Sequence, residues 1–263
     1  FSTAESLPNL SDAFTAVANG DVDLALRGIT ANLLRDATAG IDFSDAYIET
    51  SVMLLVPEAL AITRSDQLTG SSIGVIGDTT ATERIRLELA RTGTKATITG
   101  YPNQTALYEA FIAGEVDAIA RDGVMLGTFQ QALAALEQPI NTMILDAQIS
   151  YEPLSAVVDE HQSPLKDLVN TVIAILKQAA INNVTAANVQ EQLTIAKSEQ
   201  SGSALRLLFQ LDKQITNTVK PLNTEIITAI IQTVGNIDEI RNKSFKQAND
   251  YVARLKDTMS RPL

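Results

Sequence analysis

Residues 14–28 read FTAVANGDVDLALRG, and residues 108–122 read YEAFIAGEVDAIARD. The second stretch begins 94 positions after the first (108 − 14), and several residue pairs are identical at this offset. Each copy has the pattern of a helix end, a glycine stop, a Val-Asp entry and a short apolar strand. The chain therefore contains an internal repeat of one helix-to-strand unit. The identical pairs are Ala16/Ala110, Gly20/Gly114, Val22/Val116, Asp23/Asp117 and Arg27/Arg121.

The two repeated strands end at Gly28 and Asp122. In an open α/β sheet, ligands bind beyond the carboxyl ends of the strands. We therefore expect two related lobes that each contribute one wall of a ligand-binding cleft. Strands and helices also alternate through the first 150 residues, which predicts an α/β fold with mostly parallel sheets.

The order of the expected elements divides the chain into two lobes. A second lobe over 58–145 is expected to be inserted within a first lobe made of 1–57 and 146–263. Residues 41–47 have the composition of a loop. After Pro153 the apolar residues follow helical spacing, which predicts a helical C-terminal extension that ends in a helix over 237–259.

Composition excludes several classes of protein. The chain has 263 residues and a net charge of −11, which argues against a nucleic-acid surface because such a surface needs clustered Lys and Arg. Hydrophobic residues make up 45% of the chain, as in ordinary globular proteins, and no apolar run is long enough to span a bilayer. There are no cysteines, so disulfides and thiolate metal sites are excluded.

Catalytic, metal and cofactor sites have little support in the sequence. His161 is the single histidine and lies in the polar stretch Asp159–Ser163, which is typical of a solvated loop. Neither a nucleophile elbow nor a phosphate-binding loop is present, and no spacing of carboxylates singles out a general acid and base. We therefore expect no enzyme activity, no metal and no cofactor.

Arg35 is the leading candidate for binding a ligand. It follows a Gly-Ile-Thr turn after the first repeated strand, where a guanidinium can hold a carboxylate through two parallel hydrogen bonds. The Thr30 hydroxyl is placed to complete such a site. The alternative is a solvated Arg35 that pairs with Asp36 or Asp42, because exposed ion pairs of this kind are common.

Two further candidates belong to the second lobe. Thr79 and Thr80 follow a strand and precede a helix, where unpaired backbone N–H groups bind anions. Asp122, at the end of the second repeated strand, suits an ammonium group. The alternative for both places is an ordinary helix cap. A carboxylate-binding arginine in one lobe and an ammonium-binding aspartate in the other form the pattern that a zwitterion requires.

Short motifs over most of the chain resemble those of polar amino-acid-binding proteins of ABC transporters, which have the type II periplasmic-binding-protein fold. The branch that they resemble most is the general L-amino-acid-binding proteins. The first-lobe motifs are Gly28–Thr30, Leu33–Asp36 and Ile41–Tyr47; the second-lobe motifs are Gly74–Val75, Thr79–Thr80 and Gly114–Asp117 with Asp122; the later motifs are Ile149–Leu154, Val184–Val189 and Val234–Asn236.

The resemblance implies a role for each candidate residue. Arg35 would hold the α-carboxylate of an L-amino acid, with help from Thr30 and the amide of Thr80. Asp122 would hold the α-ammonium group, and Gly28 would contribute its backbone. The protein would deliver its ligand to the membrane permease of an ABC importer. It would be periplasmic or otherwise extracytoplasmic, either free or anchored through an N-terminal segment.

Three departures from the family pattern bear on this interpretation. The strand and helix with which the family begins have no counterpart before Phe1. Asp78 stands where the family usually has Gly, and Ala31 and Asn32 replace bulkier residues of the general branch. A carboxylate at position 78, beside the expected anion site, should weaken carboxylate binding or favour a cationic ligand. Two alternatives therefore stay open, a degenerate scaffold or interaction module and a dehydratase-like enzyme on the same fold.

Overall fold

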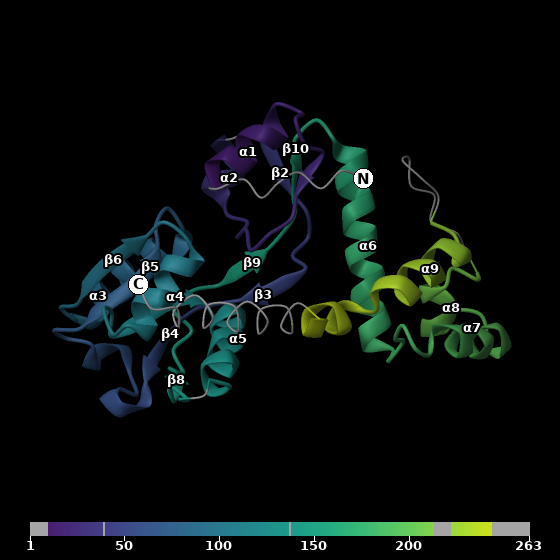
Figure 1. Ribbon diagram of the computed structural model, residues 1–263. Coiled ribbons are helices and arrows are strands. Elements are labelled where there is room, and N and C mark those ends of the chain that lie inside the picture. The colour runs from purple at the N-terminus through teal and green to yellow at the C-terminus, as the bar shows by residue number, and fades with distance from the viewer. Residues whose placement is uncertain (1–9, 39, 137, 213–221, 244–263) are drawn as a thin grey trace, which may run out of the picture. The chain divides into compact units, whose positions relative to one another are not determined.

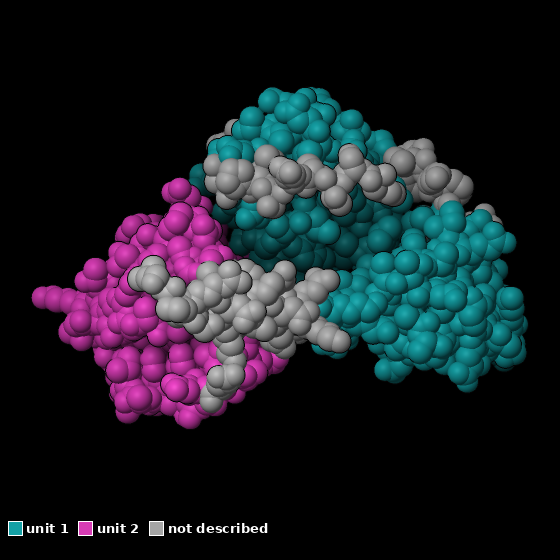
Figure 2. Space-filling view, viewed as in Figure 1, with its two compact units in different colours: residues 1–48, 154–244 teal, residues 49–153, 245–263 magenta. Residues whose placement is uncertain are grey.

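The computed structural model describes residues 10–38, 40–136, 138–212 and 222–243 (Figure 1). The described residues form two compact units, which Figure 2 distinguishes by colour. One unit contains the described residues up to 48 and from 154 onward, and the other contains residues 49–153. The chain passes between the units at β3 (Ile48–Thr50) and β9 (Glu152–Leu154), which pair in a two-stranded sheet.

The unit of residues 49–153 has a five-stranded sheet in the order β6-β5-β7-β4-β8. β5 pairs in parallel with β6 and β7, whereas β4 pairs antiparallel with both β7 and β8. Four strands therefore run in one direction and β4 alone runs against them. The strands are β4 (Val52–Pro57), β5 (Ser72–Ile76), β6 (Thr97–Tyr101), β7 (Ala118–Asp122) and β8 (Thr142–Ile144).

Helices cover both faces of this sheet. Alternate residues of β4 show this arrangement, because Leu54 packs in a core with α3 (Thr80–Thr92), whereas Leu55 packs in a second core with α4 (Gln104–Ile112) and α5 (Gly123–Ala134). A strand buried on both faces needs the continuous apolar run that the chain has at 52–56. Residues 52–57, which the sequence placed in the first lobe, therefore belong to this unit.

The other unit has a three-stranded sheet in the order β1-β10-β2, with antiparallel pairing throughout. Its strands are β1 (Leu24–Ala25), β2 (Ile41–Phe43) and β10 (Val157–Asp159), and they pack with α1 (Leu10–Ala18) and α2 (Leu33–Thr38). A separate apolar core joins the remaining helices of this unit. These helices are α6 (Ser163–Ile181), α7 (Val189–Ser198), α8 (Ala204–Leu208) and α9 (Thr224–Val234).

The two copies of the repeat have the same local structure. Gly20 and Gly114 adopt left-handed φ angles of 74° and 76°, which glycine tolerates without a Cβ clash. The amide of Gly20 bonds the carbonyl of Val17 at 3.0 Å, and the amide of Gly114 bonds the carbonyl of Phe111 at 3.1 Å. The following residue of each copy donates to the carbonyl of the equivalent alanine at 2.9 Å. The predicted helix end and glycine stop are confirmed in both copies.

The predicted α/β class is confirmed, but the expectation of mostly parallel pairing is wrong. The five-stranded sheet is mixed because β4 runs against its neighbours, and the three-stranded sheet is antiparallel because β10 runs against both β1 and β2. The expected loop at 41–47 contains β2, and the expected all-helical region after Pro153 contains β10.

The C-terminal extension is helical from α6 onward, as expected. Residues 237–243 form the start of the predicted last helix. The remainder of the helix expected at 237–259 lies outside the described residues. None of the described helices is long and apolar enough to cross a membrane.

Candidate functional site

Arg35 lies on α2, and its guanidinium is fixed by two contacts. Nη1 donates to the carbonyl oxygen of Thr30 at 2.7 Å, and the guanidinium carbon lies 5.9 Å from the centre of the Phe14 ring. The Asn32 side chain caps the start of α2 by accepting from the Arg35 amide at 3.0 Å. Asp42, which with Asp36 is the alternative partner of a solvated arginine, accepts from Lys166 Nζ at 2.5 Å. Arg35 and Thr30 are therefore brought together as expected.

Thr30 and Gly28 lie on the segment that follows β1. Thr30 is 4% exposed and forms an isolated antiparallel bridge with Leu154. Gly28 is exposed, and a Cβ built on it would meet no heavy atom within 4 Å. Packing therefore does not require glycine at position 28, but the absence of a side chain leaves its backbone open to approach.

Thr80 is the first residue of α3, a helix of thirteen residues. Thr79 occupies the N-cap position, but its side chain makes no capping hydrogen bond and its Oγ1 donates to the Ile76 carbonyl at 2.8 Å. The Thr80 Oγ1 donates to Glu152 Oε2 at 2.9 Å. The hydroxyls of Thr79 and Thr80 therefore do not act as the ordinary helix cap that the alternative interpretation required.

Asp78 lies in the turn before α3 with φ 57°. This left-handed conformation favours glycine, and aspartate is one of the residues that tolerate it. The backbone thus explains why glycine suits this position. It also places an exposed carboxylate side chain two residues before Thr80.

Asp122 is the last residue of β7, where it lies opposite Val52 of β4. It is also the N-cap residue of α5, but its side chain makes no capping hydrogen bond. Asp122 therefore occupies the N-cap position that the alternative interpretation gave it, without a capping bond from its side chain. The following Gly123 approaches β4 closely, because a Cβ there would meet the Met53 sulfur at 2.6 Å.

Glu152 is a candidate residue that the sequence analysis missed. Its side chain is 0% exposed, and it accepts from Thr80 Oγ1 at 2.9 Å and from Arg84 Nε at 3.3 Å. A buried charge requires such partners, because an uncompensated one is strongly destabilising. The available sequence signal was the alternation on β9, where Glu152 takes the same inward position as buried Leu154.

An arginine also lies over the aromatic ring that begins each copy of the repeat. Tyr108 is the equivalent of Phe14, and the Arg121 guanidinium carbon lies 5.5 Å from the centre of its ring. Arg121 Nη1 also donates to the Tyr108 hydroxyl at 2.9 Å. In the first copy the arginine over the ring is Arg35 instead of Arg27, so sequence equivalence alone did not reveal this pairing.

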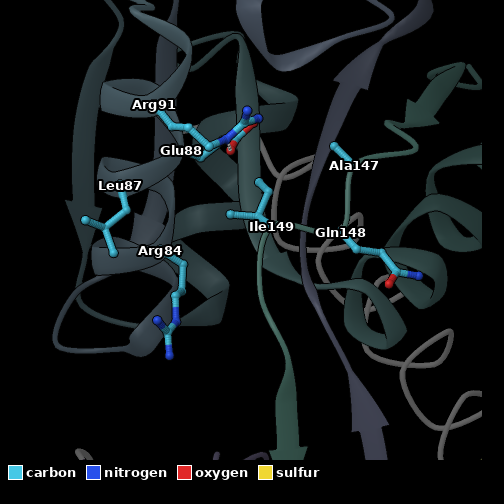
Figure 3. A pocket seen from close by; sticks show the side chains of 7 residues that line it. All are labelled: Arg84, Leu87, Glu88, Arg91, Ala147, Gln148 and Ile149. Atoms are coloured by element: carbon cyan, nitrogen blue, oxygen red, sulfur yellow. Dashed lines mark hydrogen bonds and ion pairs between the residues drawn. The ribbon is translucent and has the colours of Figure 1, made fainter.

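A cavity of about 360 Å³ lies beside α3 in the unit of residues 49–153. Figure 3 shows side chains of α3 on one side of it and residues 147–149 on the other. Glu88 and Arg91 form an ion pair at this cavity with a shortest distance of 2.8 Å. The hydrogen bond from Arg91 lowers the pKa of Glu88, although burial opposes this shift.

Metal and histidine chemistry receive no support from the part of the chain that the structure describes. No group of three or more His, Cys, Asp or Glu residues there is arranged to hold a metal ion. His161 is exposed, and its backbone amide donates to Asp159 Oδ1 at 2.7 Å.

Comparison with known proteins gives relatives of one kind. No family model matches the chain. It is 24% identical over 241 residues to the general L-amino acid-binding periplasmic protein AapJ of Rhizobium johnstonii, covering 92% of this chain and 69% of that one. It is 27% identical over 195 residues to the glutamate/glutamine/aspartate/asparagine-binding protein BztA of Rhodobacter capsulatus, covering 74% and 56%. The matched region thus spans about two thirds of the length of the first relative and little more than half of the length of the second.

A solved structure shows the same fold. An ABC transporter periplasmic binding protein from Brucella ovis, with glutathione bound, is 25% identical, with a TM-score of 0.73 over 89% of this chain and 72% of that one. This chain has the fold of a type II periplasmic binding protein. Within that fold, one unit of the chain carries Gly28, Thr30 and Arg35, and the other carries Thr80 and Asp122.

Proposed function

We propose that the chain is a solute-binding protein of an ABC transporter that captures an L-amino acid. The observation that carries the proposal is the fixed guanidinium of Arg35, with Nη1 bonded to the Thr30 carbonyl and its face against Phe14. Binding proteins gain affinity when a charged group is held in place before the ligand arrives, because less freedom is lost on binding. The amino-acid-binding relatives support the same conclusion.

The ligand contacts in this proposal follow the family resemblance residue by residue. Arg35 holds the α-carboxylate, with Thr30 and the backbone amide of Thr80 as further donors. Asp122 accepts from the α-ammonium group, and Gly28 contributes its backbone. The position of the Thr80 amide at the start of α3 favours this assignment.

The location and partner follow from the relatives as proposals. The protein acts outside the cytoplasm, in the periplasm or anchored to the membrane surface, and delivers its ligand to the permease of an ABC transporter. It carries out no catalysis in this proposal. A dehydratase-like activity on the same fold would convert the bound ligand, so recovery of the ligand unchanged after incubation distinguishes binding from turnover.

Calorimetric titration with each proteinogenic L-amino acid tests the proposal. We expect at least one to bind with micromolar or tighter affinity. Arg35→Ala should weaken that binding by about 30-fold to 5,000-fold, because truncating one partner of a desolvated charge pair costs about 2–5 kcal/mol. Asp122→Asn should also weaken binding of that amino acid.

The matched control is Arg86→Ala, which removes an exposed arginine that pairs with Glu83 on the surface of α3. This variant should bind as the wild type does. Absence of heat with every amino acid, or full affinity in Arg35→Ala, would reject the proposed function.

A further inference from the structure

The backbone carbonyl groups of residues 27–30, just after β1, differ in their partners. The Arg27 carbonyl accepts from the Ile29 amide at 2.6 Å, and the Ile29 carbonyl accepts from another backbone amide at 3.0 Å. The Thr30 carbonyl accepts from Arg35 Nη1 at 2.7 Å. Within the described part of the chain, no hydrogen bond engages the Gly28 carbonyl, and Gly28 is exposed. The Gly28 carbonyl is therefore the one in this segment that is left to accept from a ligand.

A tight turn gives Gly28 this exposure. The bond from the Ile29 amide to the Arg27 carbonyl joins residues two positions apart, which makes a γ-turn with Gly28 at its centre. The amide and carbonyl of the central residue take no part in the bond that closes such a turn. A turn that is closed by one hydrogen bond has little stability of its own, so its shape depends on what else holds it.

Tyr47 supplies a second bond to this turn. Its hydroxyl donates to the Arg27 carbonyl, the same group that closes the γ-turn, and a carbonyl oxygen has two lone pairs to accept both bonds. The backbone of Tyr47 is fixed as well, because its amide donates to the Leu154 carbonyl at 2.9 Å. The preceding residue is held by α6, since Lys177 Nζ donates to the Ala46 carbonyl at 2.6 Å. The Tyr47 hydroxyl therefore ties the turn to a fixed part of the same unit.

We propose that Tyr47 is a positioning residue that holds the Gly28 carbonyl in place to accept from the α-ammonium group of the ligand. The inference rests on the proposed function, in which Gly28 contributes its backbone to the binding of an L-amino acid. An ammonium group has three donors, so a carboxylate and a carbonyl can both accept from it. A carbonyl that is fixed before the ligand arrives binds more tightly, because less freedom is lost on binding. Tyr47 acts through Gly28 in this scheme.

Tyr47→Phe tests the proposal, because it removes the hydroxyl and keeps the ring. With the amino acid identified by calorimetry, we expect binding to weaken by about threefold to thirtyfold. This loss alone does not locate the effect within the ligand. Two analogues of the same amino acid do so, when each is measured in competition with it.

The first analogue is the α-hydroxy acid, in which a hydroxyl with one donor replaces the ammonium group. The preference for the amino acid over this analogue should fall by about threefold or more in Tyr47→Phe. The second analogue is the amino-acid amide, which lacks the carboxylate. The preference over the amide should stay within about twofold, because the contacts of Arg35 with Thr30 and Phe14 do not involve Tyr47. A merely structural role of Tyr47 would not separate the two preferences.

Amide hydrogen exchange in the free protein distinguishes a local effect from a general loss of stability. The Ile29 amide closes the γ-turn, whereas the Ser44 amide donates to the Ala156 carbonyl at 2.9 Å in the same unit. In Tyr47→Phe, exchange should become faster by about threefold or more at Ile29 and should change less at Ser44.

Tyr151→Phe is the matched control. It removes a tyrosine hydroxyl that makes no hydrogen bond to any described residue, from a side chain that is 63% exposed. The affinity and both preferences of this variant should stay within about twofold of the wild type.

Unchanged affinity in Tyr47→Phe would overturn the inference. Weaker binding with an unchanged preference over the α-hydroxy acid would also overturn it, as would an equal loss of both preferences or equally faster exchange at Ile29 and Ser44. In these outcomes the wild type still binds an amino acid, so the proposed function stands. Absence of binding to every amino acid in the wild type rejects both proposals.

Discussion

Asp23 and Asp117 are equivalent residues of the repeat in different surroundings. Asp117 Oδ2 accepts from the Ser72 amide at 2.7 Å and from the Ser72 hydroxyl at 2.8 Å, which joins β5 to the entry of β7. Asp23 is exposed before β1, which lies at the edge of its three-stranded sheet among the described residues. One residue type at one repeat position therefore makes very different contributions to stability.

Asp117→Ala should lower the free energy of unfolding by about 1–3 kcal/mol, because the Ser72 donors lose their acceptor. Asp23→Ala should change it by less than about 0.5 kcal/mol, as expected for an exposed side chain. Urea unfolding followed by circular dichroism measures both variants. Equal losses in the two variants would contradict this account of the repeat.

At the scale of elements, the sheet of residues 49–153 depends on a close approach between β5 and α4. A Cβ built on Gly74 would lie 2.6 Å from Leu107 Cδ1 and 3.2 Å from Val116 Cγ2. Both neighbours are buried in the core and have little room to move. Gly100, on the adjacent β6, has its nearest contact at 3.8 Å and is exposed.

Gly74→Ala should therefore destabilise the protein by about 1–3 kcal/mol through overpacking. Gly100→Ala is the matched control, because its extra methyl group meets only ordinary contact distances; its effect should lie within about 1 kcal/mol in either direction. Thermal unfolding compares the two variants. A Gly74→Ala variant as stable as Gly100→Ala would show that α4 moves away at little cost.

The turns around α8 are joined by Asp212. This carboxylate accepts from Arg206 Nη2 at 2.7 Å and from the Gly202 amide at 2.8 Å. The hydrogen bond from Arg206 is the largest cause that lowers the pKa of Asp212 to about 2, and the bond from Gly202 adds to it. The ordinary value is 3.8, so the unfolded chain binds this proton more readily than the folded chain.

A lowered pKa in the folded state stabilises the protein above the unfolded value, and this stabilisation is lost as pH falls. The contribution of Asp212 should therefore be complete above about pH 4 and disappear toward pH 2. Unfolding measured across this range should show a smaller loss of stability in Asp212→Asn than in the wild type. Identical pH profiles would mean that the pair with Arg206 does not persist in solution.

At the scale of the whole molecule, a ligand that binds only the folded protein should raise its melting temperature. At a ligand concentration one hundred times the dissociation constant, the gain is about 2.7 kcal/mol. The amino acid identified by calorimetry should therefore shift the transition upward in the wild type, and stabilise Arg35→Ala by at most about a third as much at the same concentration. Equal shifts in the two proteins would show that Arg35 does not contact the ligand.

The sequence by itself determined the repeat, the α/β class and most element positions. These features are local, because helical spacing, apolar runs and glycine stops at Gly20 and Gly114 depend on residues near one another in the chain. Arg35, Thr80 and Asp122 were also selected by local context, since each follows a strand end. Their ligand contacts stay predictions.

The tertiary structure decided which distant residues meet. The direction of β4 depends on its pairing with β7, which lies some 65 residues later, and apolar spacing records burial without recording the partner. The contact between Thr80 and Glu152 spans 72 residues. Only the folded chain brings that buried carboxylate to the hydroxyl, because a hydrogen bond requires two groups within about 3 Å and sequence patterns carry no such distance.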